Sequence, residues 1–157
     1  MSIGTTIIGL ILLFIFIGPI AYLIIHQQAK KKKIALQIKE VTAMYHMNIT
    51  EQFDIEGHYF ILDLDKRFLL YIHMIKNEIA NHTLYPIYKI THLSYEVKRS
   101  STAKSTQSIG QLIWCITIEN EHIHQIKVYD ESDGNWVQAE AYQHQLQVLT
   151  TKLKPLL

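Results

Sequence analysis

A long apolar stretch without charge opens the chain and constrains it more than any other feature. Residues Ile3–Ile25 contain no Asp, Glu, Lys or Arg, and four consecutive lysines, Lys30–Lys33, follow shortly after. A helix rises about 1.5 Å per residue, so this stretch would span roughly 34 Å, against a bilayer hydrocarbon core of about 30 Å. A signal peptide would have a basic start, a shorter apolar stretch and a small-x-small cleavage site. The sequence therefore predicts an uncleaved transmembrane anchor over residues 1–28.

The lysines that follow the apolar stretch predict its orientation. Lysines close to a membrane span favour the cytoplasmic side, so we expect the N-terminus outside the cell membrane and the C-terminal domain in the cytoplasm. The lone Cys115 agrees with a reducing compartment. A second interpretation is that Lys30, Lys31, Lys32 and Lys33 attract anionic lipid headgroups, at about 1 kcal/mol per lysine near the surface.

The periodicity after the lysines predicts how the rest of the chain is organised. Ile34, Ile38, Val41 and Tyr45 recur on one helical face, which predicts a basic juxtamembrane helix within residues 29–50. Residues 51–157 then suit one compact domain. The net charge is only +1, and this balance argues against nucleic acid as a partner, because phosphate neutralisation needs a concentrated basic face.

Alternating patterns within residues 51–157 predict antiparallel strands. Two β-type runs separated by Asp65-Lys66-Arg67 indicate a hairpin, and Pro86 indicates a sheet edge or a bend. The polar segment 77–83 is expected to be a loop. The expected strands are 59–64, 68–73, 84–90, 93–98, 112–118 and 122–129.

The last element is predicted to be an amphipathic helix that caps the sheet. Its apolar residues recur at spacings of three and four along one stripe, and Pro155 marks its end. The residues of this stripe are Trp136, Ala139, Tyr142, Leu146, Leu149 and Leu153. The fold class expected for the whole chain is therefore α+β: a transmembrane helix and a juxtamembrane helix, then an antiparallel β-sheet or barrel with a C-terminal helix.

This order of elements resembles a pleckstrin-homology-like domain, and more closely the small bacterial membrane-anchored proteins that carry such a domain. The segments that carry the likeness are Tyr59–Ile72, Ile90–Lys98, Leu112–Tyr129 and Trp136–Leu153. The resemblance implies a binding module without a catalytic centre. It also implies that basic residues in the first hairpin loop bind lipid headgroups in some members, while many members bind only protein. The matching loop here contains Lys66 and Arg67 beside Asp65.

Nine histidines invite a metal-binding or pH-sensing hypothesis. His122 and His124 lie two residues apart, so both rings would share one face of a strand and could chelate Zn²⁺ or Cu²⁺, with Glu119 or Glu121 as a third ligand. The alternative is that these residues are simply exposed to solvent at the start of a strand. The absence of a nearby cysteine or second histidine pair favours this alternative.

Catalytic motifs are missing from the sequence. It contains no phosphate-binding glycine loop, Ser-centred elbow or zinc-protease helix, so we expect neither enzymatic activity nor a cofactor. Tyr85, Tyr88 and Tyr95 surround Pro86 at the expected sheet edge, where aromatic side chains commonly anchor a partner protein; they would equally suit a core.

The sequence thus predicts a non-catalytic, single-pass membrane protein whose cytoplasmic β-domain binds protein. Its expected role is an accessory or scaffold subunit of a membrane assembly, with the lipid bilayer and other subunits of a membrane complex as partners. One alternative is a module that senses anionic lipid headgroups. The other is a His-based metal-binding or pH-sensing domain. The partner's identity and the oligomeric state stay open.

Overall fold

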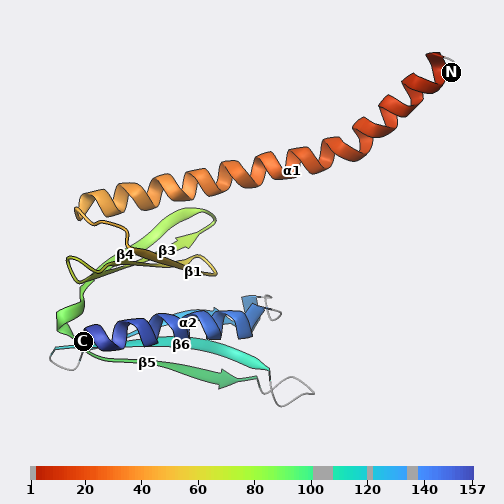
Figure 1. The fold of residues 1–157 in the computed structure, drawn as a ribbon. Helices are drawn as coiled ribbons and strands as arrows, with labels where there is room; N and C mark the ends of the chain where they lie inside the picture. Colours follow the sequence, from red (N-terminus) through yellow and green to blue (C-terminus); the bar gives the residue numbers. More distant parts are fainter. Residues whose placement is uncertain (1–2, 101–107, 120–121, 134–137) are drawn as a thin grey trace. The chain divides into compact units, whose positions relative to one another are not determined.

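The computed structural model describes residues 3–100, 108–119, 122–133 and 138–157, with the backbone alone for residues 3–14 and 133. The chain divides into two compact units, residues 1–40 and 41–157. The described part of the first unit is helical throughout. Helix α1 (Ile3–Met44) contains Pro19 and passes without a break through residues 28 and 29, so the two N-terminal helices expected from the sequence are one element (Figure 1).

The prediction of a membrane-spanning helix is wrong for the part of α1 whose side chains are described. From residue 15 onwards, no helical stretch combines the length and the apolar character that crossing a membrane requires. The predicted anchor covers residues 1–28, of which residues 15–28 have described side chains. The cell-membrane location and the orientation inferred from this segment therefore have no support in the described structure.

The second unit begins with a four-stranded antiparallel sheet in the order β1-β2-β3-β4. The hairpin predicted around residues 65–67 is confirmed as β2 and β3, and the edge position predicted for Pro86 is confirmed at the end of β4. The loop predicted over residues 77–83 is wrong, because residues 78–83 belong to β4, and the strand predicted over 84–90 ends at Pro86, where a 3-10 helix follows. The strand bounds are β1 (Glu51–Ile55), β2 (His58–Asp63), β3 (Phe68–Ile75) and β4 (Glu78–Pro86).

Two-residue turns close the first and third hairpins of this sheet. The turn between β1 and β2 is Glu56-Gly57, with φ of 50° and 80°, and that between β3 and β4 is Lys76-Asn77, with φ of 53° and 64°. Turns with positive φ at both central residues match the right-handed twist of the flanking strands. Gly57 is required sterically as well, because a Cβ there would meet the carbonyl oxygen of Met74 at 3.0 Å.

A three-stranded antiparallel sheet in the order β5-β6-β7 follows, connected by the short 3-10 helix η1 (Ile87–Lys89). The strands predicted over 93–98, 112–118 and 122–129 are confirmed within it. The predicted C-terminal helix is also confirmed, although Trp136, expected at its start, lies outside the described residues. The bounds are β5 (Ile90–Arg99), β6 (Ile109–Ile118), β7 (His122–Asp130), η2 (Glu131–Asp133), α2 (Ala139–Leu153) and η4 (Lys154–Leu156).

One apolar core joins the two sheets and α2, which packs against β1, β5 and β6 (Figure 1). Trp114 of β6 is fully buried and lies edge-on to Phe60 of β2, with ring centroids 4.9 Å apart. Its indole Nε1 donates a hydrogen bond of 3.1 Å to Oγ1 of Thr150 in α2. A single side chain therefore contacts both sheets and the helix.

The closed form of the predicted β-barrel is wrong. In the described part of the chain the strands form two separate sheets, with β1 and β4 at the edges of one and β5 and β7 at the edges of the other. A barrel closes only when its edge strands pair. Here α2 packs against the two edge strands β1 and β5, while side chains of β4 and β7 line a cleft. The edge strands β4, β5 and β7 contribute to the candidate sites together with residues of the central strands.

Candidate functional site

The larger candidate site is a groove between the end of strand β5 and the first half of helix α2, named here the helix–strand groove. Its volume is about 740 Å³. Two neighbouring strands and one helix provide its described walls. The lining residues are Val97, Arg99, Ile109, Glu140, Gln143, His144 and Gln147.

The sequence builds this groove from two simple periodicities. Val97 and Arg99 alternate onto one face of β5, and Ile109 of β6 pairs with Arg99 across the ladder. Helix α2 buries its apolar stripe in the core, which leaves the neighbouring polar stripe beside β5. The result is a floor with apolar side chains and a wall of amide, imidazole and carboxylate groups. The residues of this polar wall are Glu140, Gln143, His144 and Gln147.

Strand β5 is also an edge strand, paired on one side with β6 within the described sheet. An edge strand presents backbone N–H and C=O groups that can pair with an added strand. The groove residues offer little for catalysis, since Glu140 and His144 are both exposed and hydrolytic chemistry would need opposed environments or an activated nucleophile. The arrangement suits binding of an extended chain.

The second candidate site is a cleft of about 410 Å³ between the edges of the two sheets, named here the histidine cleft. His58 of β2 and His73 of β3 are cross-strand partners, and their rings stack with centroids 4.4 Å apart and an interplanar angle of 5°. Nδ1 of His58 lies 2.8 Å from the hydroxyl of Tyr71, in hydrogen-bond contact. The lining residues are His58, Tyr71, His73, Asn81, Thr83, Tyr85, His124, Gln125, Ile126 and Lys127.

Burial shifts the pKa of three side chains in this cleft. His58 is only 8% exposed, and burial, together with the neighbouring His73, lowers its pKa to about 4. Burial also raises the pKa of Tyr71 and of Tyr85, so both phenols keep their protons at neutral pH. The spacing of His58 and His73 along the chain does not by itself indicate a shared site. The hairpin register was the missing signal, because pairing Asp63 with Phe68 also pairs His58 with His73.

The described structure does not bring further metal ligands together with His122 and His124, the two histidines proposed to bind a metal. His122 and His124 are both exposed on β7. The ring of His124 lies edge-on to Tyr85, with centroids 5.6 Å apart, and faces the histidine cleft. Among the described residues, no group of three or more His, Cys, Asp or Glu side chains is placed to hold a metal ion. Glu121 lies outside those residues.

The basic residues proposed for lipid headgroups have different environments. Lys66 Nζ donates a hydrogen bond to the carbonyl oxygen of His46, and Arg67 Nη2 donates one to the carbonyl oxygen of Leu156. These two contacts tie the β2–β3 turn to the segment after α1 and to the C-terminus. Lys30, Lys31, Lys32 and Lys33 are exposed on α1, in the other unit.

The three tyrosines proposed as partner anchors do not form one surface. Tyr85 is 4% exposed and belongs to the core, whereas Tyr88 of η1 is 59% exposed. Tyr95 of β5 is partly buried against the core, two residues before Val97 and therefore on the same strand face as the helix–strand groove. Of the three, Tyr95 is the residue nearest in register to a candidate site.

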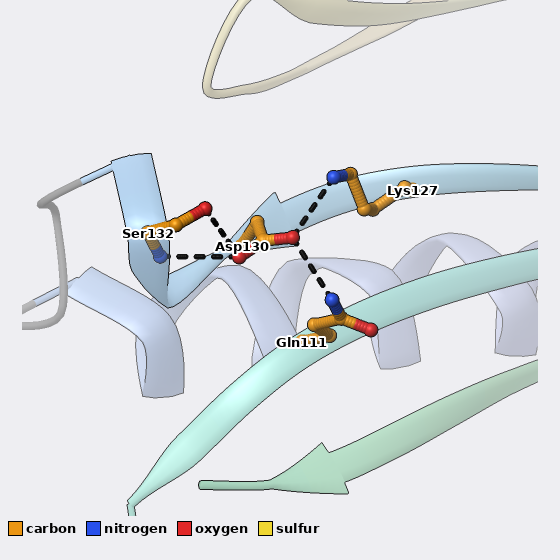
Figure 2. A network of polar contacts seen from close by, with 4 residues as sticks. All are labelled: Gln111, Lys127, Asp130 and Ser132. Carbon is orange, nitrogen blue, oxygen red and sulfur yellow. Dashed lines mark hydrogen bonds and ion pairs between the residues drawn. The ribbon is translucent and has the colours of Figure 1, made fainter. Parts of the chain in front are cut away.

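Asp130, the last residue of β7, has a structural role. Its carboxylate accepts hydrogen bonds from Lys127, Gln111 and Ser132, and this network joins β6, β7 and η2 (Figure 2). The bond from Lys127, supported by those from Ser132, holds the pKa of Asp130 well below its usual range. Cys115 is buried and its pKa is raised by burial, which is unfavourable for a nucleophile.

Comparisons with known proteins add no identification. No protein-family model, curated protein sequence or solved structure matches the chain. The resemblance to a pleckstrin-homology-like domain stays a prediction from the sequence pattern.

Proposed function

We propose that residues 41–157 form a non-catalytic binding module that takes an extended segment of another protein into the helix–strand groove. In this mode the partner adds a strand to the open edge of β5 while its alternate side chains contact the groove. Backbone hydrogen bonds would give affinity, and the side-chain contacts would give specificity. The role agrees with the accessory or scaffold function expected from the sequence.

The observation that carries the proposal is the position of an edge strand beside a large open groove. β5 ends one sheet, and the groove beside it has a volume of about 740 Å³. Arg99 and Glu140 supply charges of both signs, and Gln143 and Gln147 supply amide donors and acceptors. Such a mixture suits a polypeptide, which presents both N–H and C=O groups along its length.

A display library of random peptides selected against the intact chain tests the proposal. The affinity of a selected peptide is then measured by fluorescence anisotropy for the wild type and for Gln147→Trp, which fills the groove from its exposed helical wall. We expect at least a tenfold loss of affinity, equivalent to about 1.4 kcal/mol. The matched control is Gln52→Trp, the same change at an exposed position on β1.

The control should bind like the wild type, and both variants should keep the wild-type unfolding midpoint. Selection of no peptide would contradict the proposal. A selected peptide that binds Gln147→Trp as well as it binds the wild type would also contradict it, because such a peptide does not use the groove.

A further inference from the structure

The described lining of the histidine cleft contains several bases and no carboxylate. The bases are His58, His73, His124 and Lys127. Lys127 forms an ion pair of 2.8 Å with Asp130, which does not line the cleft. The three imidazoles are therefore the groups whose charge is not balanced by an acidic neighbour in the lining.

The elements packed around His58 contribute basic and neutral side chains to the described lining. From β3, Tyr71 and His73 face it, and from β4 the lining residues are the neutral Asn81, Thr83 and Tyr85. From β7 come His124 and Lys127. Asp54 of β1 and Glu56 of the turn before β2 act on the tyrosines of β2 and α2 and do not line the cleft. Burial and His73 both act against protonation of His58.

Two stacked imidazoles 4.4 Å apart repel each other when both are protonated. An anion beside them removes this repulsion and accepts charge-assisted hydrogen bonds. Neutral donors are also present, since Asn81 and Gln125 carry amide groups and Thr83 a hydroxyl group. The cleft volume of about 410 Å³ exceeds what a few heavy atoms need.

We infer that the histidine cleft is a binding site for a small oxyanion, a carboxylate or a tetrahedral phosphate-like group, and that binding takes up protons. The cleft is neutral at its imidazoles when they are deprotonated and positive when they are protonated. Anion affinity therefore increases as the pH falls, by about tenfold per pH unit for each proton taken up. This inference is independent of the helix–strand groove, which shares no lining residue with the cleft.

The test uses the intact chain with its histidine side chains isotopically labelled for NMR. Sulfate and formate serve as probes because both stay ionised between about pH 5.5 and about pH 7.5, above the ordinary pKa of a carboxylic acid. Chloride at equal ionic strength is the reference. We expect saturable shifts of the His58, His73 and His124 signals at the lower pH, and at least tenfold weaker binding at the higher pH.

Two variants separate the cleft from general surface effects. His73→Gln keeps a polar side chain but removes one base of the stack, and we expect it to weaken anion binding at least tenfold. His92→Gln changes an exposed histidine of β5 outside the cleft and should bind like the wild type. Unfolding midpoints measured at the higher pH establish that both variants are folded.

Saturation by either probe supports the inference and identifies the geometry, tetrahedral for sulfate and planar for formate. The inference is overturned if neither anion produces saturable shifts, if affinity is equal at the two pH values, or if His73→Gln binds as tightly as the wild type. Loss of peptide binding at the helix–strand groove would leave these results unchanged.

Discussion

The hydrogen bond between Trp114 and Thr150 connects the three-stranded sheet to α2, and Thr150→Val removes it with little change in shape. Both side chains are buried, at 0% and 5% exposure, and the bond length is 3.1 Å. The substitution leaves a buried indole N–H without its acceptor, which costs about 1–3 kcal/mol. For a unit of this size the expected decrease in melting temperature is about 4 to 12 °C. Thr and Val have similar helix propensities, so the change reports on the bond.

Urea denaturation of the intact chain, followed by circular dichroism, measures the loss in the free energy of unfolding. The same substitution at exposed Thr91, whose hydroxyl donates to the carbonyl oxygen of Thr117, is the control and should stay within about 0.5 kcal/mol of the wild type. In a Trp114→Phe background, Thr150→Val should cost much less, because the indole donor is already absent. Equal losses in both backgrounds would refute the reasoning.

Three further predictions concern the same unit. The free energy of unfolding should fall by about 3 kcal/mol as the pH decreases from about 6.5 to about 4, because His58 binds a proton in this range when unfolded but has a pKa of about 4 when folded. Urea titrations at each pH measure this decrease. The same dependence of the unfolding free energy on pH in His58→Gln would contradict it. Leu149→Ala removes a fully buried side chain of α2 and should cost about 2–5 kcal/mol by urea denaturation, whereas exposed Gln147→Ala should cost less than about 0.5 kcal/mol; similar losses would argue against the core position of α2. Gly57→Ala should lower the free energy of unfolding by more than about 1 kcal/mol, since φ is +80° and the new Cβ meets the carbonyl oxygen of Met74; an unchanged unfolding midpoint would exclude this hairpin geometry.

Much of the β-domain could be predicted because its strands follow the period of two and its last helix a clear apolar stripe. The hairpin around residues 65–67 and the stripe from Ala139 to Leu153 were predicted correctly for that reason. Strand β4 was not, because residues 78–83 show no apolar–polar alternation on this edge strand. The membrane span was predicted from the length and lack of charge of residues 3–25, and the described part of α1 does not support it.

The candidate sites depend on tertiary contacts that local patterns do not contain. The helix–strand groove exists because α2 packs against β5 and β6 of one sheet and against β1 of the other, and no residue spacing within α2 specifies that placement. The burial of Tyr85 and the exposure of Tyr88 likewise follow from where η1 bends the chain between the sheets. The His58–His73 stack differs, because the turn length of the β2–β3 hairpin already implies the pairing.

Amide hydrogen exchange gives the sharpest test of the helix–strand groove as a peptide site. The exchange rates of the intact chain are measured with and without a saturating selected peptide. Strand addition predicts at least tenfold slower exchange for the β5 amides that point away from β6, with unchanged exchange at the edge strands β1 and β4. Unchanged exchange along β5, with protection at another edge, would contradict the proposed function.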